Sequence, residues 1–181
     1  GTVSEVWGEL QRAAGATERL LELLDTPQAI AAPPDPIALP ETARGAIEFA
    51  AVRFAYPARP NAVALERFSL SVAPGECVAL VGPSGAGKST VFALLLRFYD
   101  PQSGTVRIDG IELRATDPRA MRSLVAVVPQ EPVIFAASVL DNVRYGRPQA
   151  SRDEVTQACA QAFALEFVER LPQGLDTILV E

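Results

Sequence analysis

The chain has 181 residues, 49% of them hydrophobic and 21% charged, which is long enough for one globular domain with an appendage. Its formal net charge of −6 at pH 7 argues against a nucleic-acid partner, which needs a basic surface, but it allows a local phosphate site built from backbone amides. No apolar run approaches the roughly eighteen residues that a membrane span needs, and the first residues lack the pattern of a signal peptide.

The N-terminal part of the chain predicts a helix followed by a linker. Residues 2–25 carry apolar side chains at helical spacing with charges opposite them, which indicates an amphipathic helix. Five prolines lie between residues 27 and 40. Proline fixes φ and removes an amide donor, so this stretch is predicted to be an extended linker. We therefore expect the helix to belong to a different part of the protein from the domain that follows.

The remaining elements are predicted from periodicity and from turn residues. Short strands are expected over residues 46–56, 68–72 and 76–82, because each is rich in β-branched or aromatic residues and is bounded by Pro or Gly. A helix over residues 88–100, a hairpin over 104–113 around Asp109-Gly110, and a buried strand over 124–130 come next. Further helices are expected over residues 138–146, 151–163 and 164–170.

The most specific motif is the stretch GPSGAGKST at residues 82–90. It fits G-x-x-x-x-G-K-[ST] and lies between an apolar predicted strand and a predicted helix, the context in which this motif binds a polyphosphate. Glycines let consecutive amides face inward, and the helix N-terminus stabilises anionic charge. Lys88 is expected on the β- and γ-phosphates and Ser89 on Mg²⁺. The predicted phosphate-binding residues are Gly82, Pro83, Ser84, Gly85, Ala86, Gly87, Lys88, Ser89 and Thr90.

The distribution of basic residues supports the phosphate-binding motif. Lys88 is the single lysine beside fifteen arginines, so the compact ammonium occurs where phosphate oxygens are expected. Cys77 and Cys159 have no metal-ligand spacing, and we interpret them as free thiols.

Residues 46–181 resemble the nucleotide-binding domain of ABC transporters. The resemblance rests on the stretch from VRFAYP to the phosphate loop, on RFYDPQSGTVRIDG, on VVPQEPVIFAASVLDNVRYG and on LPQGLDTILVE. It is strongest with the exporters whose membrane and ATPase domains share one polypeptide. The resemblance implies an α/β P-loop NTPase fold of the ABC ATPase type, with an incomplete core, an antiparallel β subdomain and the N-terminal amphipathic helix.

The family's roles transfer to matching positions. Tyr56, in FAYP, corresponds to the aromatic residue that stacks on adenine. Gln130 corresponds to the Q-loop glutamine, which reaches Mg²⁺ and the attacking water; with Lys88 it is a predicted catalytic residue. Asp100 and Asp109 are interpreted as solvated turn carboxylates. Glu181 aligns with a glutamate that precedes the family's signature sequence.

The resemblance also implies a larger assembly. Residues 1–26 match the cytosolic end of the last membrane helix, 27–45 the linker, and 46–181 the first part of the ATPase domain. The implied cofactors are ATP and Mg²⁺, and the implied partners are the transmembrane domain of the same polypeptide and a second nucleotide-binding domain. The expected location is the cytoplasmic face of the cell (inner) membrane, with this piece itself soluble.

Three parts of the family's catalytic machinery have no counterpart in the sequence: the signature, a strand ending in Asp-Glu, and a histidine. We therefore expect the chain alone to bind Mg-ATP without hydrolysing it. In the family, strands that come late in the sequence flank the strand before the phosphate loop. Without them residues 77–81 would lack partners, so an oligomeric, rearranged or partly ordered chain is expected.

Two other functions fit the phosphate loop alone. A stand-alone nucleotide kinase or other P-loop NTPase fits the length, although the loop begins only at residue 82 and the guanine-reading Asn-Lys-x-Asp is absent. A nucleotide-sensing module that binds partners through its N-terminal helix is the third interpretation. The sequence does not identify a transported substrate.

Overall fold

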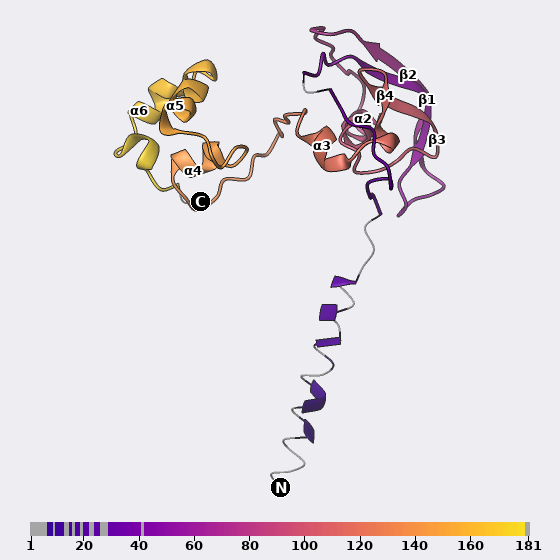
Figure 1. Ribbon diagram of the computed structural model, residues 1–181, viewed down its shortest axis with the longest axis horizontal. Helices are drawn as coiled ribbons and strands as arrows, with labels where there is room; N and C mark the ends of the chain where they lie inside the picture. Colours follow the sequence, from indigo (N-terminus) through magenta and orange to yellow (C-terminus); the bar gives the residue numbers. More distant parts are fainter. Residues whose placement is uncertain are drawn as a thin grey trace. The chain divides into compact units, whose positions relative to one another are not determined.

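The computed structural model divides the chain into two compact units, Gly1–Ala126 (unit 1) and Val127–Glu181 (unit 2), shown in Figure 1. It describes residues 29–40 and 42–179 and, nearer the N-terminus, residues 7, 8, 10–12, 15, 17, 18, 20, 21, 24 and 25. Those N-terminal residues have helical backbone from residue 7 to residue 24, in agreement with the predicted helix. None of the helices among the described residues combines the length and apolar character that crossing a membrane requires.

Unit 1 contains an antiparallel four-stranded sheet in the order β2-β1-β3-β4. Its strands are β1 (Ile47–Ala55), β2 (Val63–Val72), β3 (Ser103–Ile108) and β4 (Ile111–Glu112). The predicted strands at 46–56 and 68–72 are thus confirmed, although β2 begins five residues earlier than expected. The predicted hairpin is also confirmed, because Asp109 and Gly110 both have positive φ in the turn between β3 and β4.

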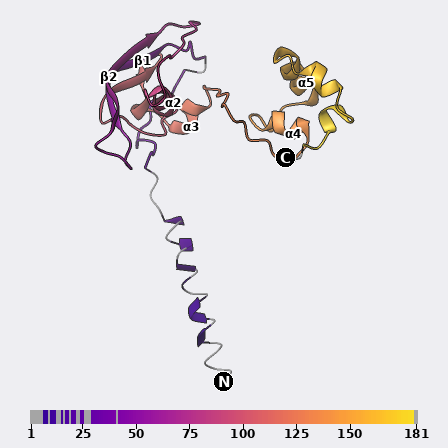
Figure 2. The same ribbon diagram turned by 180° about the vertical axis from the view of Figure 1, so that it is seen from behind.

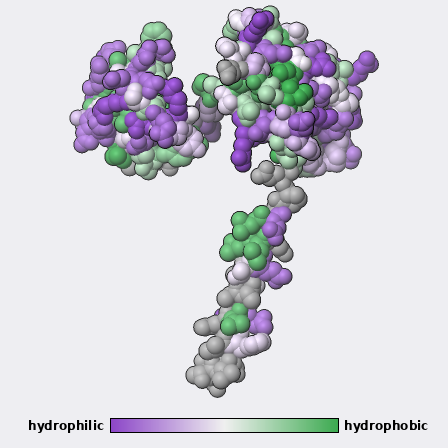
Figure 3. Space-filling model, in the orientation of Figure 1, coloured by the Kyte–Doolittle hydropathy of each residue, from purple (hydrophilic) through white to green (hydrophobic). Residues whose placement is uncertain are grey.

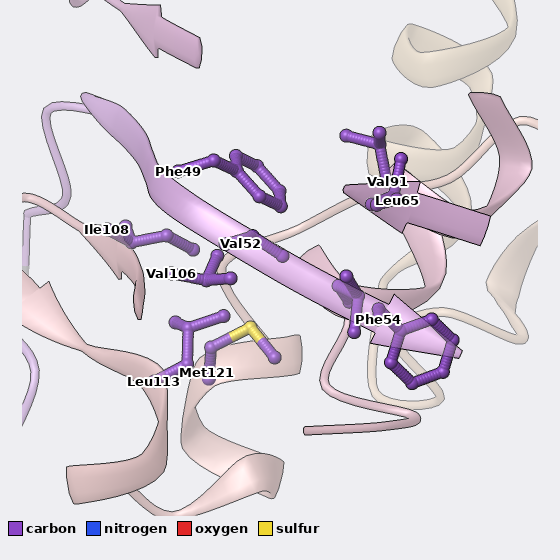
Figure 4. Close-up of a cluster of buried hydrophobic side chains, with 10 residues drawn as sticks. Phe49, Val52, Phe54, Leu65, Val91, Val106, Ile108, Leu113 and Met121 are labelled. Atoms are coloured by element: carbon purple, nitrogen blue, oxygen red, sulfur yellow. The ribbon is translucent and has the colours of Figure 1, made fainter. Parts of the chain in front are cut away.

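One face of this sheet packs against three short helices of unit 1. These are α2 (Lys88–Leu95) and α3 (Pro118–Arg122), seen beside the sheet in Figures 1 and 2, and the 3₁₀ helix η1 (Leu113–Ala115). Figure 4 shows the core around β1; its buried residues are Phe49, Val52, Phe54, Leu65, Val91, Leu94, Val106, Ile108, Leu113 and Met121. The core thus fixes the position of α2, the helix that follows the phosphate loop.

Helix α3 was not predicted. Its local signal is the pair Asp117-Pro118: the Asp117 carboxylate accepts a bond from the Arg119 amide at 2.8 Å, and Pro118 occupies the first turn. The predicted helix 88–100 is too long, because α2 ends at Leu95 and Arg97 has a φ of 50° that a helix cannot continue.

Unit 2 is helical, as predicted. It contains α4 (Val139–Arg144), α5 (Arg152–Gln161), α6 (Leu165–Glu169) and the 3₁₀ helix η2 (Gly174–Asp176). Serines begin two of these helices: Ser138 caps α4, and Ser151 with Glu154 forms a capping box on α5. Its core consists of Val139, Ala150, Val155, Cys159, Val168 and Leu175.

The predicted strands at residues 76–82 and 124–130 are wrong, since neither stretch has strand backbone. A strand exists only when its amides and carbonyls pair with a neighbour, and the sheet of unit 1 includes neither stretch. Several of their apolar side chains are therefore exposed, Val81 to 88% and Val128 to 95%, whereas Leu80 and Val125 lie partly buried against the core. Figure 3 shows apolar residues reaching the surface of unit 1.

The proline-rich segment has neither helix nor strand over residues 29–40, as predicted, but it is bonded to the body of unit 1. The Ile37 amide donates to the Ala115 carbonyl at 2.7 Å, and Nη2 of Arg97 donates to the Ala31 carbonyl at 3.3 Å. The segment is therefore held against the unit that carries the phosphate loop.

Two arginines hold the C-terminal end of α2. The Arg97 side chain is 6% exposed; besides Ala31 it bonds to the Thr116 carbonyl (2.8 Å) and pairs with Asp100 (3.2 Å). Arg122 donates to the carbonyls of Leu96 (2.9 Å) and Arg97 (2.8 Å). Cations are favourable at a helix C-terminus, whose last carbonyls have no partner within the helix. Asp100, expected to be a solvated turn carboxylate, is instead part of this network.

We predict that Arg97→Ala lowers the free energy of unfolding by about 3 kcal/mol, because it leaves a buried carbonyl without its donor and removes the packed side chain. Urea denaturation measures the change. Arg53→Ala is the control, because its pair with Glu66 is 45% and 59% exposed and should contribute about 1 kcal/mol or less. Equal losses for the two variants would contradict the structural role of Arg97.

Asp109 also has a structural role that the sequence did not indicate. Its carboxylate accepts bonds from the amides of Arg44 (2.8 Å), Gly45 (3.4 Å) and Ala46 (2.9 Å). Desolvation acts to raise its pKa, but these amides, led by Ala46, together outweigh desolvation and lower the pKa below the usual value. The hairpin turn thereby fixes the chain just before β1.

A lowered carboxylate pKa stabilises the fold above the pKa of the unfolded chain, about 3.9, and this contribution is lost as the pH falls through the lower folded value. We therefore expect unfolding free energy to decrease below about pH 4, and to decrease less in Asp109→Asn. Urea denaturation between pH 7 and pH 3 tests this. Asp35→Asn, at an exposed position, controls for the loss of one negative charge. Identical pH profiles for Asp109→Asn and the unsubstituted chain would refute the role.

Candidate nucleotide-binding site

The phosphate loop follows the stretch 76–82 and leads into α2, whose first three residues are Lys88, Ser89 and Thr90. Gly85 and Gly87 have φ of 80° and 84°, in the left-handed region that favours glycine. The Ala86 amide donates to the Pro83 carbonyl at 3.2 Å, which closes the turn. Gly87 is the N-cap of α2 and offers no side-chain cap, so the first amides of the helix remain available to an anion.

Close packing against β2 fixes the position of this loop. A Cβ on Gly87 would lie 2.6 Å from the Ala64 carbonyl oxygen and 2.8 Å from Cδ2 of Leu65. Glycine is therefore required here for two reasons, the positive φ and the space. At Gly85 a Cβ would meet nothing within 4 Å, so only the backbone conformation favours glycine there.

The Lys88 ammonium lies over the loop. Its Nζ donates to the carbonyls of Gly82 (2.8 Å) and Pro83 (2.7 Å), and Lys88 is half-buried. Two of its three protons thus point at loop carbonyls, and a bound anion would offer stronger, charged acceptors for the same protons.

A cavity of about 420 Å³ opens at this loop. It is lined by Tyr56, Ala64, Ser84, Gly85, Gly87, Lys88, Ser89 and Thr90. The structure thus brings Tyr56 together with six of the nine predicted loop residues. Ala64 was missed, since β2 was predicted to begin four residues after it and an alanine carries no chemical signal.

Strand register explains why Tyr56 lies at the cavity. Phe54 pairs with Leu65 and Ala55 with Val63, so the end of β1 lies beside Ala64, the residue that Gly87 contacts. Tyr56 follows β1 directly. Its ring meets those of Phe54 and Tyr99 edge-on, with centroids 4.9 and 5.2 Å apart, and its hydroxyl lies 3.0 Å from Oγ1 of Thr90.

A larger cavity, about 650 Å³, lies elsewhere in unit 1, between residues 29–32, Phe98 and the residues around α3. It holds none of the glycine loop. We assign the nucleotide site to the smaller cavity because it combines an ammonium, a helix N-terminus, hydroxyls and an aromatic ring.

Two sequence predictions are not placed at this site. Gln130 belongs to unit 2, so its position relative to the loop stays a prediction. Glu181 lies outside the described residues. No group of three or more His, Cys, Asp or Glu residues with metal-binding geometry occurs in the part of the chain that the structure describes.

Comparison with known proteins decides the family. The family model described as ABC transporter matches residues 65–176. The chain belongs to the ABC transporter family. It is 44% identical over 184 residues to mouse (Mus musculus) ATP-binding cassette sub-family B member 10, mitochondrial, and 51% identical over 138 residues to ABC transporter B family member 21 of Arabidopsis thaliana.

A solved structure supports the same assignment. A bacterial Atm1-family ABC exporter with ATP bound superposes with a TM-score of 0.87 at 37% identity, covering 99% of this chain and 31% of that chain. The predicted ABC ATPase fold is therefore confirmed, and the alternative of a stand-alone nucleotide kinase is set aside. The match to the mouse protein covers 100% of this chain and 26% of that relative. The match to the Arabidopsis protein covers 76% of this chain and 11% of that relative.

Within this ABC ATPase fold, the two loop glycines should differ in their tolerance of a side chain. We predict that Gly87→Ala lowers the free energy of unfolding by about 3 kcal/mol or more. The alanine is strained by the positive φ at this position, and β2 or α2 must also move to make room for its Cβ. Gly85→Ala should cost only the positive-φ strain, about 1 kcal/mol. Urea denaturation of both variants tests this pair. Equal destabilisation would show that the contact with Ala64 contributes nothing.

Proposed function

We propose that the chain is the Mg-ATP-binding part of an ABC exporter whose ATP hydrolysis drives substrate export across a membrane. The observation that carries this proposal is the cavity at the phosphate loop, which joins the Lys88 ammonium and the start of α2 to the Tyr56 ring. The ammonium and the helix start suit a triphosphate, and the ring suits an aromatic base at the other end of the same ligand. Membership of the ABC transporter family narrows that ligand to ATP.

The loop residues and Tyr56 divide the binding of ATP between them. Amides of residues 82–90 and the α2 N-terminus bind phosphate oxygens. Lys88 exchanges the carbonyls of Gly82 and Pro83 for the β- and γ-phosphates, and the Tyr56 ring stacks on adenine.

The residues at the cavity fit Mg²⁺ bound together with a nucleotide. Mg²⁺ usually retains waters and uses one or two protein ligands besides phosphate oxygens. The Ser89 hydroxyl at the cavity supplies one such ligand, and Gln130 is the proposed second. Bound there, Mg²⁺ neutralises charge on the phosphates. Gln130 is also proposed to orient the attacking water.

The proposal places this chain in a larger assembly. Residues 1–26 are the cytosolic end of the last membrane helix, 27–45 the linker and 46–181 the first part of the ATPase domain, at the cytoplasmic face of the cell membrane. The described residues of the N-terminal helix support this, because Trp7, Leu10 and Leu24 are 63%, 59% and 80% exposed and offer apolar surface to a neighbour. A second nucleotide-binding domain completes the catalytic site.

The proposed exporter contains, outside residues 1–181, the strand partners and the catalytic motifs that residues 1–181 do not contain. The exposed apolar stretches 76–82 and 124–130 pair with further strands of the same ATPase domain. This accounts for their composition, since strands buried on both faces are apolar throughout. The signature, the Asp-Glu strand and the histidine come from the same additional sequence.

We predict that Lys88→Ala weakens Mg-ATP binding to the chain by at least about tenfold, because charge-assisted hydrogen bonds to phosphate are lost. Isothermal titration calorimetry with Mg-ATP measures the affinity. Arg107→Ala is the control, since it removes one positive charge from the sheet, where Arg107 pairs with Glu48. Its affinity should stay within about twofold of that of the unsubstituted chain.

Two results would overturn the proposal. One is the absence of saturable Mg-ATP binding by well-folded protein. The other is steady phosphate release that increases in proportion to the amount of the 181-residue chain and is lost in Lys88→Ala. The chain alone should bind Mg-ATP without turnover.

A further inference from the structure

The Tyr56 hydroxyl and the Thr90 hydroxyl form the one direct hydrogen bond that is described between the two ends of the proposed ATP site. Their oxygens are 3.0 Å apart, although the residues are 34 positions apart in the sequence. Thr90 is 4% exposed, so water competes little for its hydroxyl. Tyr56 follows β1, whereas Thr90 lies in the first turn of α2, directly after Lys88 and Ser89.

The other contacts of the Tyr56 ring do not fix its tilt by themselves. Phe54 and Tyr99 meet it edge-on at interplanar angles of 79° and 85°. Such contacts stabilise a ring but permit a range of orientations. The bond from its hydroxyl to a buried partner restricts the remaining rotation, and the partner sits on the turn that carries the phosphate ligands.

We propose that Thr90 is a positioning residue that sets where the adenine-stacking ring of Tyr56 lies relative to the phosphate loop. This rests on the proposed function, in which Tyr56 stacks on adenine. The Thr90 hydroxyl thereby fixes the spacing between base and phosphates to that of an adenine nucleotide. The side-chain hydroxyl of Thr90 then affects the binding of a nucleotide through its base, whereas the backbone amide of Thr90 remains one of the proposed phosphate donors.

Separate measurement with a nucleotide and with phosphates alone tests this. We use the full natural polypeptide that contains residues 1–181, with ADP and inorganic pyrophosphate as ligands that it cannot turn over. Each competes in the presence of Mg²⁺ against a fluorescent adenine nucleotide. Tyr56→Phe and Thr90→Val each remove one hydroxyl with little change of shape, and Thr90→Ser keeps the hydroxyl. Tyr145→Phe removes a phenolic hydroxyl in unit 2 as the matched control.

We expect Tyr56→Phe and Thr90→Val to weaken ADP binding about three- to tenfold, as the loss of one hydrogen bond does, while pyrophosphate binding changes less than about twofold. The double variant should be no weaker than either single one, because both remove the same bond. Thr90→Ser should bind ADP within about twofold of the unsubstituted protein, and so should Tyr145→Phe.

Failure of this inference and failure of the proposed function give different results. Unchanged ADP binding in Thr90→Val, or equal weakening of ADP and pyrophosphate, overturns the positioning role; the second result would mean that Thr90 acts on the phosphates. Tyr56→Ala tests the stacking itself. If it leaves the preference for ADP over pyrophosphate unchanged, the adenine-stacking assignment of Tyr56 fails, and the positioning role of Thr90 fails with it.

Discussion

The close approach of Gly87 to β2 is the constraint on which the rest of the site depends. A side chain at this position would reach within 2.6 Å of the Ala64 carbonyl, so helix α2 can begin here only because the residue has none. Starting α2 at this point places Lys88, Ser89 and Thr90 in succession on one turn. The pairing of β1 with β2 then brings Tyr56 to the same place from the other side. One backbone contact therefore joins the antiparallel sheet, which carries the aromatic ring, to the loop that carries the proposed phosphate-binding residues.

Opposite charges suit the two ends of α2. At its N-terminus the glycine cap leaves amides for an anion, with the single lysine of the chain beside them. At its C-terminus the carbonyls of Leu96 and Arg97 accept bonds from Arg122. A planar guanidinium reaches two neighbouring carbonyls at once, whereas a compact ammonium can move between phosphate oxygens. The use of Arg at one end and Lys at the other follows from the shape of the groups that each must bind.

The sequence predicted best what depends on local chemistry. The glycine loop, the Asp109-Gly110 turn and the helices of unit 2 each carry their own signal within a few residues, and the structure agrees with them. The strands predicted over residues 76–82 and 124–130 did not form, because a strand needs a partner. Composition and periodicity do not reveal whether the partner is present, and for residues 77–81 only the family resemblance indicated that it is missing. Ala64, and the roles of Arg97 and Thr90, could not be predicted from the residues alone, because each depends on contacts between elements that are far apart in the sequence. Family resemblance predicted Tyr56 as a site residue, but its hydrogen bond to Thr90 required the structure.

The proline-rich segment is not a free linker, because Arg97 bonds to it. An extended proline-rich chain with no contacts transmits little force except when it is taut. Here Ala31 bonds to the side chain of Arg97, and the Ile37 amide bonds to Ala115 beside Thr116, a second partner of the same arginine. Arg97 lies two residues beyond the end of α2, and this eight-residue helix is about 12 Å long. A helix of two turns is rigid on that scale. The segment is therefore bonded to the residues that directly follow the same helix whose first turn carries the proposed phosphate-binding residues.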